Sequence, residues 1–156
     1  RRAAARVGKT PLFLLAFAGG YQRTSVYNYA TFGGDVSLKI VGPLRIEVSA
    51  RAGVSVSYPD PDGETSAVGR FMLVGIGGGP TLQFDGPVRP RVGAWFQIAP
   101  NPSGVGGPKA LAGFVIHGGV DLPLRGSPIA IRPAIEGGIL GPMPFVRGLI
   151  ELVLGF

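Results

Sequence analysis

The sequence predicts an all-β chain, and three observations carry this prediction. Gly and Pro contribute 27 and 15 of the 156 residues, so hardly any window of about 12 residues could form an uninterrupted helix. Apolar and polar residues alternate strictly over long stretches, which is the period of a β-strand. No run of about 18 apolar residues occurs, which excludes helices that cross a membrane. The length fits one domain.

Four strands are expected in the first half of the chain. The first, 12–22, includes an apolar stretch, and the second, 29–41, alternates an apolar face containing Val36 with a polar face containing Asp35. The third, 44–58, continues the alternation far beyond the length of an average strand. The fourth, 70–83, contains five residues with four glycines (75–79), which we interpret as relief of crowding and not as a phosphate loop.

Four further strands are expected at 88–98, 110–122, 129–140 and 144–156. In the seventh, Ile131 and Ile135 face away from Arg132 and Glu136. The last strand alternates perfectly up to the end of the given sequence.

The connectors alternate in character along the chain. Tight turns are expected at one end of the strands and longer or Gly- and Pro-rich connectors at the other: 42–43, 85–87 and 125–128 against 23–28, 59–69, 99–109 and 141–143. Both ends of the chain then fall at the tight-turn end. This pattern predicts eight antiparallel strands in up-and-down order.

The alternation alone leaves open which face points outward, since a soluble lipocalin-like barrel would have its apolar face inside. The polar face consists mostly of small residues, Arg and Glu, with almost no Lys, and suits the packed interior of a narrow barrel. Strands of 11–15 residues match a tilted crossing of about 25 Å of hydrocarbon. We therefore expect the apolar face to contact lipid, as in a transmembrane β-barrel.

The chain end carries a resemblance to a known family. Residues 150–156 place Ile150, Leu152, Leu154 and Phe156 on one face, and this resembles the C-terminal insertion signal of bacterial outer-membrane β-barrels. Length, strand number and loop arrangement are similar to the small eight-stranded barrels of the OmpA transmembrane domain and OmpX type. The resemblance implies a Gram-negative outer-membrane location. Its implied partners are the lipid bilayer with its lipopolysaccharide and the barrel-assembly machinery.

The polar face carries charges of both signs: Lys39, Arg45, Arg51, Arg89, Arg91, Arg132 and Arg147 against Asp35, Glu47, Asp121, Glu136 and Glu151. Unpaired charges in a closed, narrow lumen would cost several kcal/mol each. An eight-stranded barrel is only wide enough to be filled by its own side chains. We therefore expect ion pairs that plug the lumen, while the excess of cations leaves open a narrow, anion-leaning pore.

Charge pairing also predicts the register of three hairpins, because a slip of one residue would turn every side chain to the wrong face. The expected opposing pairs are Lys39 with Glu47, Asp35 with Arg51, Asp121 with Arg132, His117 with Glu136, Arg132 with Glu151, and Glu136 with Arg147. Two rows of charges would then cross the lumen wall.

The sequence gives little support for a catalytic, metal or cofactor site. The chain has no Cys, and its single histidine, His117, falls in mid-strand on the polar face. We interpret His117 as a hydrogen-bonded lumen residue, with a lipid-modifying enzyme as a lesser alternative. The acidic residues Asp60, Asp62 and Glu64 fall short of a calcium-loop pattern. No metal, cofactor or catalytic residue is therefore assigned.

The expected organisation is a basic connector over 1–10 and a barrel domain over 11–156. Basic residues before the apolar stretch also fit a retained signal peptide, which stays open. The net charge of +6 is dispersed along the chain and predicts no nucleic-acid partner. We expect a non-enzymatic structural barrel, either monomeric or part of a larger protein.

Overall fold

The computed structural model describes residues 9–24, 28–57, 71–100 and 109–156. Within these residues eight strands form one closed, all-antiparallel barrel in sequence order. They are β1 (Phe13–Thr24), β2 (Asn28–Val41), β3 (Leu44–Ser57), β4 (Phe71–Gln83), β5 (Arg89–Pro100), β6 (Ala110–Pro123), β7 (Ile129–Leu140) and β8 (Met143–Gly155). The predicted fold class is confirmed, and each strand boundary lies within two residues of its predicted position.

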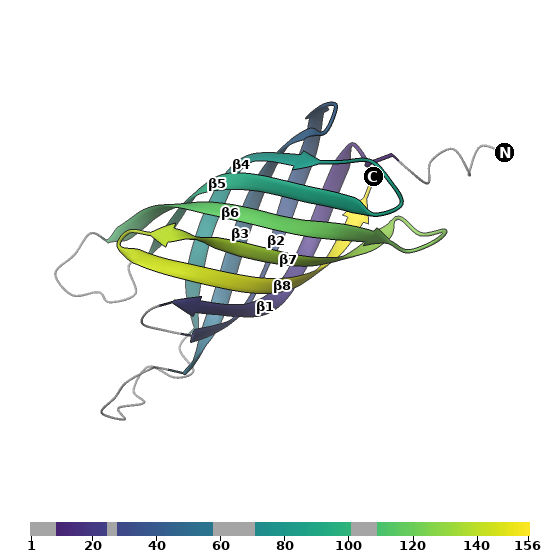
Figure 1. Cartoon of the computed structure of the whole chain (residues 1–156). Coiled ribbons are helices and arrows are strands. Elements are labelled where there is room, and N and C mark those ends of the chain that lie inside the picture. Colours follow the sequence, from purple (N-terminus) through teal and green to yellow (C-terminus); the bar gives the residue numbers. More distant parts are fainter. Residues whose placement is uncertain (1–8, 25–27, 58–70, 101–108) are drawn as a thin grey trace.

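The barrel closes where its first and last strands meet. β1 pairs antiparallel with β8 from Leu14↔Gly155 to Thr24↔Phe145. The backbone N–H groups of Phe13 and Phe156 donate to each other's carbonyl oxygens at 3.1 and 2.9 Å. The tight turns after β2, β4 and β6 lie at this same end, toward the top and the right of Figure 1, as the connector pattern predicted.

The two faces of the strands are sorted as predicted, with charge inside and apolar side chains outside. Val48 and Ile150 are 55% and 61% exposed, whereas Arg132 and Arg147 are 1% and 0% exposed. This is the reverse of a soluble protein, in which charged side chains are almost never fully buried unless paired. Among the described residues there is no helix long and apolar enough to cross a membrane.

Glycines of the interior face make room for the neighbouring strand and its side chains in this narrow barrel. A Cβ on Gly79 would meet the backbone of Ala94 and Trp95 on β5, and one on Gly75 would collide with the side chain of Gln97. The cluster of glycines on β4 therefore relieves crowding, as its place in the alternation predicted.

The register is as predicted in two of the three hairpins. In β6–β7, His117 lies opposite Glu136, and in β7–β8, Arg132 lies opposite Glu151 and Glu136 opposite Arg147. In these two hairpins, the register that places opposite charges beside each other is also one that the connector between the strands permits.

The register predicted for the β2–β3 hairpin is wrong by two residues. Lys39 lies opposite Arg45 and not Glu47, and Asp35 lies opposite Ser49 and not Arg51. The reason is the turn, in which Val41 pairs with Leu44 and only Gly42 and Pro43 connect them, together with an irregularity in the pairing between Lys39 and Val41. Gly42 has φ +54°, the left-handed conformation that two-residue hairpin turns require at this position. The turn and this irregularity together set the register of the hairpin, and the charges do not determine it.

Candidate functional site

The candidate site is the charged interior of the barrel. Among the described residues, six arginines and five carboxylates are buried: Arg45, Arg51, Arg89, Arg91, Arg132 and Arg147, with Asp35, Glu47, Asp121, Glu136 and Glu151. Each comes from the polar face of a strand, because alternation places every second residue inside. The barrel thus brings charged side chains from six of its eight strands together in one interior.

Arg51 is the centre of this network. Its guanidinium donates to Asp35 Oδ1 at 2.7 Å and Oδ2 at 3.1 Å, to Glu136 Oε1 at 3.0 Å and to Glu151 Oε1 at 3.3 Å. Asp35 stands on the neighbouring strand β2. Glu136 stands on β7, which lies directly across an eight-stranded ring from β3. The Arg51 side chain therefore crosses the lumen.

Two further arginines extend the network along the wall. Arg132 pairs with Asp121 and donates to Glu151 Oε2 at 2.7 Å. Arg147 pairs with Glu136, and its Nε and Nη2 donate to Gln22 Oε1 at 2.8 and 2.6 Å. Both rows that the sequence predicted between β6, β7 and β8 thus bring their arginine and carboxylate groups together.

His117 belongs to a second branch of the interior. Arg91 pairs with Glu47, and its Nη2 also lies 3.3 Å from His117 Nδ1. Because a guanidinium can only donate, Nδ1 must accept, and the ring proton is assigned to Nε2, 3.1 Å from Thr81 Oγ1. The ring of Trp95 packs on the imidazole with centroids 4.3 Å apart. His117 is therefore a neutral, fully engaged interior residue, 4% exposed.

Lys39 and Glu47 are not brought together, although the sequence analysis paired them. Lys39 lies at the rim, 3.8 Å from Asp85 Oδ1 and 2.9 Å from Thr10 Oγ1. Glu47 pairs with Arg91 instead. The two-residue turn shifts Lys39 away from Glu47, and only the longer Arg51 side chain still reaches its predicted partner, Asp35, along the diagonal.

The interior also contains apolar clusters that the sequence analysis did not assign. One lies toward the long-connector end and the other toward the tight-turn end: Trp95, Ala99, Leu111, Val115, Leu140 and Phe145, and Leu14, Ala16, Ala130 and Val153. The sequence did carry a signal for them, because the cluster members Leu111 and Val153 occupy interior positions of otherwise polar faces. An apolar cluster therefore lies toward each end of the interior, beside the charged network.

Neutral partners were missed as well, since they carry no charge to pair. Gln22, Thr81 and Gln83 all bond to charged or imidazole groups of the interior. No group of three His, Cys, Asp or Glu side chains in the described part of the chain is arranged to hold a metal ion.

The four residues of the proposed insertion signal lie on the outer face of β8 and just beyond it. Ile150, Leu152 and Phe156 are exposed, and Leu154 is partly exposed. The ring of Phe156 lies 6.3 Å from that of Phe13, next to the seam between β1 and β8.

The comparisons with known proteins concern the fold. No family model and no curated protein matches the sequence. Neisserial surface protein A (NspA) superposes with a TM-score of 0.70 at 12% identity, over 92% of this chain and 97% of that one. The N-terminal β-barrel domain of Pseudomonas aeruginosa OprF gives 0.57 at 14%, over 96% and 99%. The chain has the fold of a small eight-stranded outer-membrane β-barrel. At these identities the likeness concerns the fold alone.

Proposed function

We propose that the protein is an integral outer-membrane β-barrel with a side-chain-plugged lumen, acting as a structural anchor or as the barrel part of a larger protein. The observation that carries the proposal is the Arg51 side chain, which joins opposite walls through Asp35, Glu136 and Glu151. Dense ion pairing leaves little room for a continuous water path, and an apolar cluster toward each end of the interior supports the same closure.

The proposed setting is the outer membrane of a Gram-negative bacterium. A belt of exposed Val, Ile, Leu and Phe side chains surrounds the barrel, and such a surface is stable only against lipid. The lipid bilayer, with lipopolysaccharide, is the proposed partner. The barrel-assembly machinery would recognise Ile150, Leu152, Leu154 and Phe156 during insertion.

A narrow, anion-leaning pore is the second candidate, and a specific observation favours it. Six buried arginines face five buried carboxylates. Arg89 Nε is buried and has no hydrogen-bond partner among the described residues. A cation left over in the interior would favour the passage of anions.

Planar-bilayer recording separates the two candidates. A plugged barrel predicts that the purified wild-type protein gives no more current steps than protein-free bilayers, whereas Arg51→Ala removes the cross-lumen contact and raises conductance. Current steps of the wild type whose reversal potential indicates selectivity for chloride would instead support the pore. This selectivity should then be weaker in Arg89→Ala.

No enzymatic activity is proposed. His117 is held between Arg91, Thr81 and Trp95, so neither ring nitrogen is left to act on a substrate. His117→Ala should leave the lipid A profile of cells that express the barrel unchanged. A modification present with the wild type and lost with His117→Ala would overturn this part of the proposal.

A further inference from the structure

A short segment before β1 lies across the mouth of the barrel at its tight-turn end. Lys9 is exposed, whereas Thr10 is 7% exposed. The Thr10 N–H donates to Asp85 Oδ1 at 2.7 Å, and its hydroxyl accepts from Lys39 Nζ at 2.9 Å. In the closed strand order, β2 and β3 separate β1 from the β4–β5 turn that carries Asp85. Residues 10–12 must therefore cross the opening to make this contact.

Arg45 holds the same segment from below. Its guanidinium donates to the carbonyl oxygens of Pro11 at 2.8 Å and Leu12 at 3.2 Å, and to Ser37 Oγ at 2.7 Å and Ser37 O at 3.1 Å. No ion pair joins Arg45 to a carboxylate in the described part of the chain, although it is 1% exposed. The carbonyls of residues 11 and 12 are thus two of its acceptors, and losing them would leave donors of a buried cation unsatisfied.

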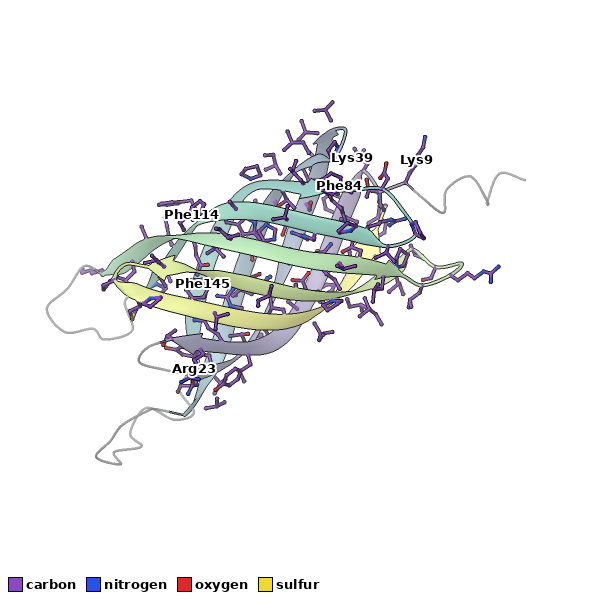
Figure 2. All side chains as sticks on the ribbon, viewed as in Figure 1. Lys9, Arg23, Lys39, Phe84, Phe114 and Phe145 are labelled. Atoms are coloured by element: carbon purple, nitrogen blue, oxygen red, sulfur yellow. The ribbon has the colours of Figure 1, made fainter. Side chains whose placement is uncertain are left out.

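We propose that residues 10–12 form a latch that closes the mouth of the lumen, with Asp85 as its catch and Arg45 as the buried group that it covers. Figure 2 shows Lys39 and Phe84, the neighbour of Asp85, at the same end of the barrel as Lys9. The latch connects residues 10–12 to side chains of the rim and of the interior. Movement of residues 10–12 would expose Arg45 to water.

The electrostatics of the rim favour the closed latch at neutral pH. The hydrogen bond from the Thr10 N–H, with Lys39 and Arg89 nearby, lowers the pKa of Asp85 below its usual 3.8. A carboxylate with a lowered pKa stabilises the closed state at pH values above 3.8. That contribution is lost only as the pH falls through the lowered value.

Cleavage by a lysine-specific protease tests the latch in the folded barrel. A closed latch protects the Lys9–Thr10 bond, because Thr10 is buried and held by two side chains. Asp85→Ala should speed cleavage after Lys9 by about tenfold, as expected for losing a hydrogen bond to a charged group. Lys109, exposed at the opposite end, supplies an internal reference whose cleavage rate should not change.

A disulfide lock provides the second arm, since the chain has no other cysteine. The hydrogen bond between Thr10 and Asp85 is compatible with the roughly 4.4–6.8 Å between Cα atoms that a disulfide needs. Oxidised Thr10→Cys/Asp85→Cys should be cut after Lys9 more slowly than the wild type, and reduction should restore cleavage. Heat-modifiable gel mobility would confirm that each variant is folded. Unchanged Lys9 cleavage in folded Asp85→Ala, or an oxidised cysteine pair that is cut as fast as the wild type, would overturn the latch.

Discussion

At the residue scale, the balance of charge in the low-dielectric interior depends strongly on one side chain, Arg51. Its guanidinium contacts three carboxylates from three different strands. Only an arginine offers enough fixed donors for this arrangement, because a lysine ammonium presents a single point of charge. Three buried carboxylates around one cation are tolerable only because Arg132 and Arg147 share two of them.

Replacing Arg51 should therefore be costly. Arg51→Met keeps much of the volume but leaves Asp35 without its ion pair, and we expect a loss of about 3–5 kcal/mol in the free energy of unfolding. Urea unfolding in lipid vesicles measures it. The exposed Arg23 supplies the control, since Arg23→Met should change stability by no more than about 0.5 kcal/mol. Equal losses in the two variants would contradict a central role for Arg51.

At the scale of single strands, the period of two decides what each residue contacts. On β3, Val48 is 55% exposed and its neighbour Ser49 is 3% exposed. The same alternation recurs along the strands of the barrel, so a single strand turns an exposed apolar face outward and a buried face toward the interior.

This arrangement predicts opposite outcomes for adjacent cysteines. A fluorophore on Val48→Cys or Ile150→Cys should be strongly quenched by a lipid-soluble quencher, because both side chains point outward. Ser49→Cys should be inaccessible to the same labelling, and Ser55→Cys, also buried, provides the repeat. Strong quenching at 49 and 55 with none at 48 would mean that the apolar face does not contact lipid.

At the scale of the whole molecule, closure of the barrel depends on the last residues of β8. They pair with β1, and Phe156, one residue beyond β8, exchanges backbone hydrogen bonds with Phe13, the first residue of β1. The outer face here is formed by Ile150, Leu152 and Phe156, so the residues that complete the seam are also those proposed to guide insertion.

Phe156→Asp should accordingly reduce the amount of folded, heat-modifiable barrel in outer membranes by a large factor, while Phe156→Trp should retain it. Spontaneous folding into lipid vesicles, without assembly machinery, separates recognition from stability. If Phe156→Asp folds normally in vesicles but not in cells, recognition of the chain end is supported. Wild-type yield of Phe156→Asp in cells would remove that support.

The sequence by itself determined the fold class, the strand boundaries and the separation of charged and large aliphatic residues onto opposite faces. These properties depend on local alternation and on Gly and Pro positions, which can be read without knowing the neighbours. It also determined two of three hairpin registers, where charge pairs and turns favour the same pairing.

Only the tertiary structure decided which groups meet across the lumen. The contact of Arg51 with Glu136 depends on barrel closure, which brings β3 opposite β7. The pairing of Glu47 with Arg91, and not Lys39, follows from a two-residue turn whose register no charge pattern revealed. Arg45 donates hydrogen bonds to backbone carbonyl oxygens, and such acceptors cannot be recognised in a sequence because every residue has one. Contacts between distant strands depend on the ring as a whole, and local pattern carries no information about them.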